Sequence, residues 1–131
     1  MKEMKYDSNI KIDLLDEGYI NEGNYTFEYV ILNLGTHPTA YILIPPHHKY
    51  YKKDYMEIPL DVYGGLTYSR DYLFWNENDK MSGWYIGWDY CHYGDYFFLS
   101  EGIAMCNFWK KWTTEEILED VKNAVKQLSE V

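Results

Sequence analysis

The stretch TTEEILEDVKNAVKQLS, residues 113–129, decides the fold class of this chain of 131 residues. From Ile117 to Leu128 its apolar residues recur at steps of one, three and four, which is the spacing of one helix face. Thr113 stands three residues before Glu116, the spacing of a capping box. The stretch therefore predicts an amphipathic helix over residues 114–129.

Upstream of this helix, several segments have the apolar patterning of strands. We expect strands at residues 10–15, 25–35, 40–45, 60–69 and 83–90, with EGYINEGN as the turn after the first and a Gly-Gly pair inside the fourth. Residues 46–59 and 92–112 read as loops, the first with room for one helical turn. One helix after several strands predicts an α+β fold, a mainly antiparallel sheet of about four to six strands with the helix packed on one face.

Composition narrows the class of protein. The net charge of −9 argues against an extended nucleic-acid interface and against binding to an anionic membrane surface. The charged start of the chain predicts no signal peptide, and no apolar run is long enough to span a membrane. Cys91 and Cys106 form no CxxC pair, which excludes a disulfide scaffold and a zinc finger. We expect a single cytoplasmic domain over residues 1–131.

Three polar and aromatic clusters are candidates for a site. They are PPHHKYYKKDY at 45–55, VYGGLTYS at 62–69 and GWYIGWDYCHYGDY at 83–96. If the last two lie on neighbouring strands and the first folds over one end of them, His48, Thr67, Asp89 and His92 meet in one cleft. The ligand-binding residues expected from these clusters are His48, Tyr51, Tyr55, Gly64, Gly65, Thr67, Asp89, His92 and Asp95.

Two functions fit such a cleft. In the first, the protein is a binder of a small, nucleotide-like molecule, because rings stack on bases and lysines meet phosphates. In the second, it is a hydrolase or lyase acting on a phosphate or glycosidic bond. His92 oriented by Asp89 would then be the general base, His48 the acid, and Thr67 with the Gly64–Gly65 amides the contact to an anion.

The sequence favours the binder over the enzyme. It contains no GxSxG elbow, no HExxH pair and no complete set of metal ligands, so we expect neither a metal nor another cofactor. Asp and His side chains at a strand end also serve as caps for backbone N–H groups, which is the structural alternative for Asp89 and His92. A third function is an inhibitor that binds a protein through its acidic surface. The sequence is compatible with a homo-oligomer.

The chain also resembles a family of small uncharacterised proteins of bacteria and their phages. The resemblance rests on AYILIPPHHKYYKKDY, DVYGGLTYS and GWYIGWDYCHYGD, followed by the terminal helix, and covers residues 40–128. Members typically show a GHP-like loop after a YVxVP strand, then VHGGLTF or VHGGLTY, then WWFGFDCAHxGD. The motif positions here are His48, Tyr51, Tyr55, Gly64, Gly65, Thr67, Gly87, Asp89, His92, Gly94 and Asp95.

Two positions depart from the pattern of that family. Tyr63 stands where relatives often have His, and Tyr90 stands where they often have Cys. A metal site built on that His or Cys would therefore be lost in this chain. The resemblance implies a site rather than an activity. A phage setting would place the protein in the host cytoplasm, where a chain of this size could act as a counter-defence protein that sequesters a host immune signal.

Overall fold

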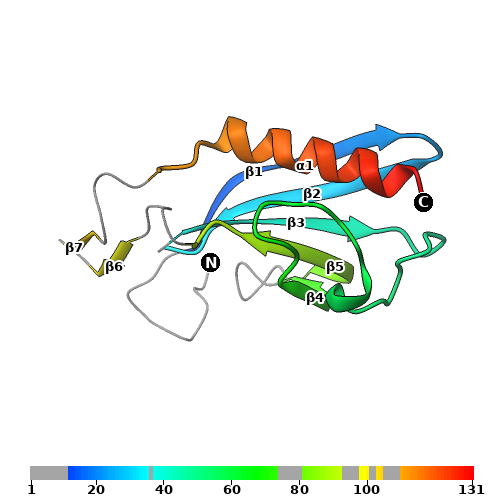
Figure 1. Ribbon diagram of the computed structural model, residues 1–131, viewed down its shortest axis with the longest axis horizontal. Helices are drawn as coiled ribbons and strands as arrows, with labels where there is room; N and C mark the ends of the chain where they lie inside the picture. The colour runs from blue at the N-terminus through cyan, green and yellow to red at the C-terminus, as the bar shows by residue number, and fades with distance from the viewer. Residues whose placement is uncertain (1–11, 36, 74–80, 93–97, 101–102, 105–109) are drawn as a thin grey trace.

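A five-stranded antiparallel sheet with the strand order β1-β2-β3-β5-β4 carries the fold (Figure 1). The computed structural model describes residues 12–35, 37–73, 81–92, 98–100, 103–104 and 110–131. The strands of the sheet are β1 (Asp13–Glu22), β2 (Tyr25–Asn33), β3 (Pro38–Ile44), β4 (Tyr68–Leu73) and β5 (Met81–Asp89). Strands β6 (Phe98–Ser100) and β7 (Ile103–Ala104) pair with each other in a second, small sheet.

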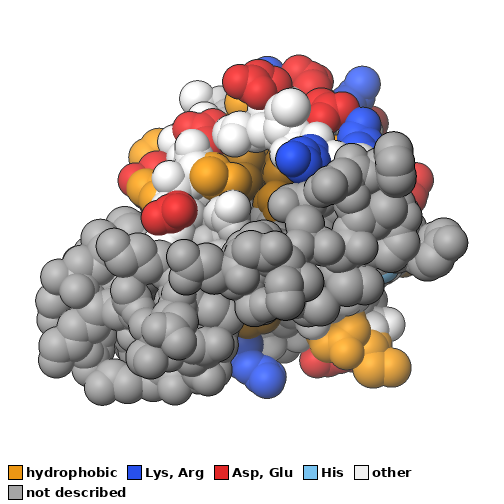
Figure 2. Space-filling view, turned by 90° about the vertical axis from the view of Figure 1, so that its left-hand side faces the viewer, with side chains coloured by type: hydrophobic (Ala, Val, Ile, Leu, Met, Phe, Trp, Pro, Cys, Tyr) orange, Lys and Arg blue, Asp and Glu red, His pale blue; other side chains and the backbone are white. Residues whose placement is uncertain are grey.

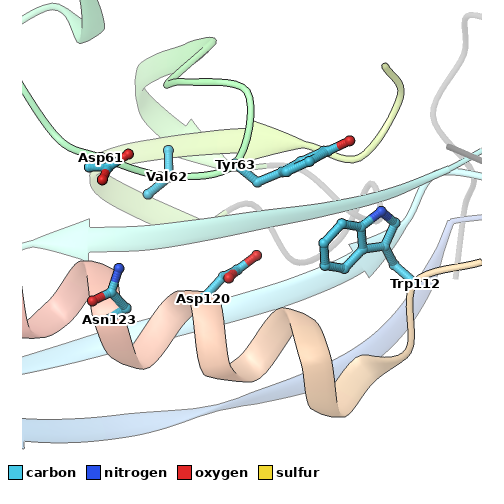
Figure 3. A pocket seen from close by; sticks show the side chains of 6 residues that line it. All are labelled: Asp61, Val62, Tyr63, Trp112, Asp120 and Asn123. Atoms are coloured by element: carbon cyan, nitrogen blue, oxygen red, sulfur yellow. The ribbon is translucent and has the colours of Figure 1, made fainter. Parts of the chain in front are cut away.

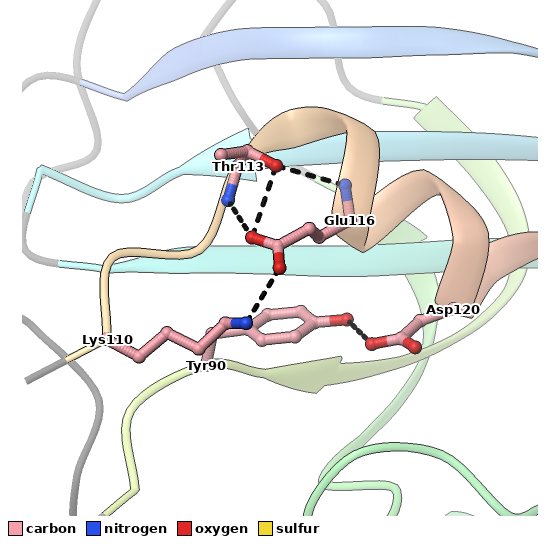
Figure 4. Close-up of polar contacts among 5 residues, drawn as sticks. All are labelled: Tyr90, Lys110, Thr113, Glu116 and Asp120. Atoms are coloured by element: carbon pink, nitrogen blue, oxygen red, sulfur yellow. Dashed lines mark hydrogen bonds and ion pairs between the residues drawn. The ribbon is translucent and has the colours of Figure 1, made fainter.

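Helix α1 (Thr114–Ser129) lies along one face of the large sheet, over β1, β2 and β3. Its start is the predicted capping box, in which Thr113 Oγ1 accepts from the Glu116 N–H and Glu116 Oε1 accepts from the Thr113 N–H (Figure 4). Its fully buried residues are Ile117, Val121, Ala124, Val125 and Leu128. Leu118, which the periodicity also places on this face, is half-buried. The predicted α+β class, the antiparallel sheet and the terminal helix are confirmed.

The sheet is buried on both faces at its centre. Toward α1, the core contains Phe27 and Ile31 of β2, Ile42 of β3 and Trp88 of β5. On the opposite face, a second cluster contains Val30, Leu32, Tyr41, Leu73 and Tyr85. The central strands β2 and β3 are therefore buried at successive positions. The segment at 25–35 was predicted to be a strand from its alternation, and the segment at 40–45 from its short apolar run.

The first hairpin differs from the prediction. The segment EGYINEGN was expected to be a turn, but β1 continues to Glu22 and only Gly23 and Asn24 connect it to β2. Gly23 has φ +60°, which suits the first central position of a type II′ hairpin turn. The turn prediction was wrong because β1 is an edge strand whose alternate residues are exposed. A polar stretch can therefore still pair along its whole length with β2.

The segment at 60–69 is also not a strand over most of its length. Residues 58–67 cross over the face of the sheet that carries α1, and β4 begins only at Tyr68. Val62 O accepts from the Gly65 N–H at 2.9 Å, and Gly64 has φ +70°, which together form a tight turn. The alternation of apolar residues here arises from packing on the core, where Leu60, Val62 and Leu66 lie half-buried.

The connection at 46–59 contains the expected helical turn. It is a short 3₁₀ helix, η1 (Tyr55–Glu57), capped by the Asp54 side chain. Backbone turns join His48 to Pro45 and Lys53 to Tyr50. This connection leaves β3 and reaches β4, which lies on the far side of β5, so the chain has to cross a face of the sheet before pairing resumes.

Buried tyrosines should make the fold sensitive to alkaline pH. Burial, together with the hydrogen bond to Asp16 at 2.9 Å, raises the pKa of Tyr29 to about 12. Burial, aided by Glu28 and Tyr19, raises the pKa of Tyr85 to about 12, and burial also raises the pKa of Tyr68. Unfolded tyrosines ionise near pH ~10, so the stabilisation is complete below that pH and is lost as the pH rises toward about 12.

Urea unfolding at pH values from about 8 to about 11 tests this expectation. The urea midpoint should stay level below about pH 9.5 and then fall steadily. The midpoint of Tyr29→Phe should fall less steeply with pH than the midpoint of the unmodified chain. A midpoint that does not change between about pH 9.5 and about pH 11 would contradict the assignment.

Candidate functional site

Thr67, Asp89 and His92 converge at the end of β5, as the sequence predicted. Asp89 is the last residue of that strand and pairs across the ladder with Thr39. Its Oδ2 accepts from Thr67 Oγ1 at 3.2 Å, and its Oδ1 accepts from the Cys91 N–H at 3.2 Å. His92 Nε2 lies 3.8 Å from Asp89 Oδ1, which is longer than a hydrogen bond.

Gly64 lies directly against the His92 ring. A Cβ at Gly64 would be 2.3 Å from two atoms of that ring, whereas a Cβ at Gly65 would meet open space. The Tyr63 ring meets His92 edge-on, with the ring centroids 5.1 Å apart. The turn at 62–65 is therefore fitted around the imidazole, and His92 helps to hold this turn against the end of β5.

Alanine at Gly64 should be costly for this reason. We expect Gly64→Ala to lower the free energy of unfolding by about 2 kcal/mol, since it adds a clash to the cost of a left-handed backbone. The matched control is Gly65→Ala, which has φ +82° and no clash and should cost only about 1 kcal/mol. When His92 is also replaced by Ala, Gly64→Ala and Gly65→Ala should lower the free energy of unfolding by the same amount, as measured by urea unfolding. An excess cost of Gly64→Ala that survives the loss of His92 would contradict this packing.

His37 belongs to the same region, although it was not among the site residues predicted from the sequence. It precedes β3 and is half-buried. Burial lowers the pKa of His37, the Asp89 carboxylate opposes that shift, and His92 adds to it. These effects place His37 beside Asp89 and His92. The pairing of Thr39 with Asp89 explains the position, because it brings the residues just before β3 to the end of β5.

His48 does not join this cluster, so the single cleft predicted from the sequence is not formed. Ile44 at the end of β3 pairs with Trp84 near the start of β5, whereas Thr39 pairs with Asp89. Five residue steps of an antiparallel strand separate these pairs, about 17 Å. The loop that carries His48 leaves β3 at the end away from Asp89. The antiparallel order of β3 and β5 makes this separation unavoidable.

His48 instead closes the C-terminal end of α1. It is 4% exposed, its Nε2 lies 2.7 Å from Leu128 O, and its Nδ1 accepts from the Tyr50 N–H at 3.0 Å. The acceptor role of Nδ1 fixes the neutral tautomer with hydrogen on Nε2, which donates to Leu128 O. The last four carbonyls of a helix lack partners within the helix, so this bond satisfies one of them. Neither nitrogen is left to act as an acid or to hold a ligand.

The other predicted residues of that loop make contacts outside the Asp89 cluster. Tyr51 packs on the core and has Lys52 Nζ 5.8 Å from its ring centroid, and the Tyr55 N–H donates to Ser69 Oγ. Trp84 Nε1 donates to Lys53 O, which fixes the loop beside the start of β5. Asp95 and Cys106 lie outside the residues that the structure describes.

A groove that the sequence did not predict lies between residues 61–63 and α1 (Figure 3). It is open to solvent and has a volume of about 260 Å³. Its lining residues are Asp61, Val62, Tyr63, Trp112, Asp120 and Asn123. In Figure 3, the first three stand on the crossing segment, and the other three come from α1 and the residue before its cap. We refer to this feature as the groove.

Both walls of the groove are held in place by hydrogen bonds. The Gln127 side chain accepts from the Asp61 N–H at 2.8 Å and donates to Asp61 O at 2.7 Å, which ties the crossing segment to α1. On the helix side, Trp88 Nε1 donates to Tyr90 OH, and Tyr90 OH donates to Asp120 Oδ2 at 2.6 Å (Figure 4). Trp88 and Tyr90 are buried, so the Asp120 carboxylate is oriented from within the core.

Aromatic rings form one end of the groove. Tyr63 stacks on Tyr90 with an interplanar angle of 5°, and Trp112 contacts both, at centroid distances of 4.8 Å and 4.9 Å. Lys110 Nζ lies 4.3 Å from the centroid of the Trp112 ring and forms an ion pair with Glu116. Tyr63 touches His92 as well, so this ring joins the groove to the Asp89 region.

One sequence signal could have pointed to the groove. Asp120 and Asn123 stand three residues apart and therefore share a face of α1, and Trp112 precedes the cap. The pattern cannot show that Asp61 faces them, because that contact depends on where the crossing segment lies.

Other site classes receive no support from the described parts of the chain. Among these residues, no group of three His, Cys, Asp or Glu side chains is arranged to hold a metal ion. No helix in the described ranges is long and apolar enough to cross a membrane.

Comparison with known proteins gives no relative from which a function could be inferred, so the functional argument starts from the fold and the groove. No family model, curated protein or solved structure matches this chain significantly. The structure defines an α+β protein whose helix and crossing segment enclose an acidic and aromatic groove.

Proposed function

We propose that this protein binds a small organic molecule in the groove between residues 61–63 and α1. The observation that carries the proposal is the combination of half-buried aromatic rings with polar groups whose positions are already set by hydrogen bonds within the chain. A site arranged before its ligand arrives loses little free energy on ordering when the ligand binds.

The lining suits a compact ligand. Tyr63 and Trp112 offer flat apolar surface, whereas Asp61, Asp120 and Asn123 offer acceptors and one amide donor. The volume of about 260 Å³ is slightly below the range of about 300–1,000 Å³ of typical small-molecule pockets. The groove is therefore better suited to a molecule of amino-acid size than to a dinucleotide.

The Asp89 region supports an enzyme less well. Both Asp89 oxygens accept hydrogen bonds from the chain itself, and the His92 nitrogen nearest to it is 3.8 Å away. The other nitrogen, His92 Nδ1, is buried. A general base needs a nitrogen within reach of a proton on the substrate. The arrangement favours the structural alternative, in which Asp89 and His92 hold the strand end and the turn at 62–65.

A nucleotide-like ligand receives less support from the charges. A phosphate in the groove would face Asp61 and Asp120, and the lysines expected to meet it lie in the loop beside the start of β5. Sequestration of a nucleotide-like immune signal stays a prediction of the family resemblance. Adenosine monophosphate belongs in the binding test for this reason.

Ligand-observed NMR with a charge-balanced fragment library and adenosine monophosphate tests the proposal. Asn123→Trp places a large ring in the groove from an exposed helix position, and Lys122→Trp is the matched control on the same helix. We expect fragments that bind the unmodified chain and Lys122→Trp but not Asn123→Trp. If no fragment shows this pattern while both variants keep the thermal midpoint of the parent, the groove is not a binding site.

A further inference from the structure

We infer that the ligand of the groove is an organic cation, an amine or guanidine carried on an aromatic or apolar body; this inference rests on the proposed function. The lining contains two carboxylates, from Asp61 and Asp120, and no Lys or Arg among the described residues. An ionised carboxylate can only accept hydrogen bonds, so these residues select a ligand that donates them.

Asp120 is prepared for such a donor. Its Oδ2 accepts from the buried Tyr90 hydroxyl, and no described residue donates to its Oδ1. The hydrogen bond from Tyr90 fixes the carboxylate plane, so the second oxygen points in a defined direction. Figure 3 shows the carboxyl group of Asp120 between the rings on one side and Asp61 with Asn123 on the other. An ammonium group at this place would have a charged acceptor, which makes the stronger class of hydrogen bond.

The rings of the groove also favour positive charge. The face of an indole attracts a cation within about 6 Å of its centroid. The chain already places one there, since Lys110 Nζ lies 4.3 Å from the centroid of Trp112. Tyr63 adds a second ring next to Trp112, with the centroids 4.8 Å apart. A carboxylate beside aromatic faces is the combination that holds an organic ammonium group, because the rings also cover its apolar body.

The electrostatic potential around the groove is also expected to be negative. The chain carries a net charge of −9, and Glu115, Glu116 and Glu119 occupy the first turns of α1 near Asp120. Figure 2 shows acidic side chains at the top of the molecule, where this helix lies, with Lys or Arg side chains beside them. Such a field raises the local concentration of cations and repels anions. A bare metal ion is not the better candidate, because the described residues offer no three-ligand set.

Three compounds with the same ring test the inference: phenethylamine, 2-phenylethanol and phenylacetate. We expect phenethylamine to bind at least about tenfold more tightly than 2-phenylethanol, and phenylacetate to bind most weakly, by NMR titration. The preference for the amine should shrink as salt is added. Binding of the amine should be lost in Asn123→Trp and kept in Lys122→Trp.

Charge-neutralising variants test which residues set the preference. Asp61→Asn and Asp120→Asn should each weaken phenethylamine binding several-fold while leaving 2-phenylethanol nearly unaffected. Glu119→Gln is the matched control, because it removes one charge from the same helix at an exposed position outside the groove. Asp61 keeps its backbone bonds to Gln127 in its variant, so misfolding does not confuse that result.

The outcomes separate this inference from the proposed function. If a neutral or anionic compound binds the groove as tightly as the amine, with binding lost in Asn123→Trp, the inference is wrong and small-molecule binding stands. If the amine binds but Asn123→Trp does not affect it, the cation site lies elsewhere and the inference is also wrong. If no fragment of any charge binds the groove, the proposed function fails with it.

Discussion

His48→Ala is expected to lower the free energy of unfolding by about 3 kcal/mol, although the residue lies in the loop between β3 and β4. The substitution removes the bond to Leu128 O and leaves the Tyr50 N–H without its acceptor. Each buried group left unsatisfied costs about 1–3 kcal/mol. It also empties the space where the ring meets Phe27 and Tyr25, at centroid distances of 5.8 Å and 4.9 Å.

The neighbouring histidine is the matched control for this prediction. His47 is exposed and only stacks on Tyr25, with the centroids 5.0 Å apart, so His47→Ala should cost less than about 1 kcal/mol. His48→Gln should recover part of the loss, because its amide can still donate toward Leu128 O. Chemical denaturation with both variants is the measurement. If His48→Ala is no more destabilising than His47→Ala, His48 does not cap α1 and its predicted role in a ligand site is open again.

Leu128→Ala should have an effect of similar size through packing alone. Leu128 is fully buried at the end of α1, within the cluster that also contains Phe27 and Ile44. Leu-to-Ala substitutions at such sites cost about 2–5 kcal/mol, since they lose apolar burial and leave a cavity. We expect about 3 kcal/mol and a clear fall in the thermal midpoint.

A second leucine provides the comparison. Leu15 lies in β1 and is 37% exposed, so Leu15→Ala should cost less than about 1 kcal/mol. Val121→Ala, at a fully buried position about two turns earlier in α1, should fall between the two. An unchanged thermal midpoint for both Leu128→Ala and Val121→Ala would mean that α1 does not pack on the sheet as described here.

The two substitutions bear differently on function. Neither His48 nor Leu128 lines the groove, so the loss of binding in either variant should follow the loss of folded protein. Binding measured well below the thermal midpoint should be close to that of the parent. Asn123→Trp should show the opposite pattern, with binding lost and stability kept. This contrast separates residues that build the fold from residues that line the proposed site.

Local features of the sequence determined α1 and the central strands. The spacing from Ile117 to Leu128 and the pair Thr113 and Glu116 act within a few residues of one another, so periodicity and capping could be read without knowledge of the fold. The strands near 25–35, 40–45 and 83–90 were found for the same reason. The α+β class followed from these elements and their order.

Sequence reasoning found part of the Asp89 region as well. Thr67, Asp89 and His92 meet because the chain enters β4 next to the end of β5, and two neighbouring strands were expected there. His37 was missed because its proximity to Asp89 depends on the pairing of β3 with β5. His48 was placed at the wrong end because the direction of each strand, and not its composition, decides which loops meet.

Only the tertiary structure decided where the polar groups converge. Asp61 and Asp120 belong to segments far apart in the chain, and they line the same groove because the crossing segment from β3 to β4 lies beside α1 on the same face of the sheet. The path of that segment follows from the strand order, in which β5 separates β3 from β4. Local periodicity specifies which face of an element is apolar, whereas long-range pairing specifies what each exposed side chain meets. The helix could therefore be predicted from the sequence, and the groove beside it could not.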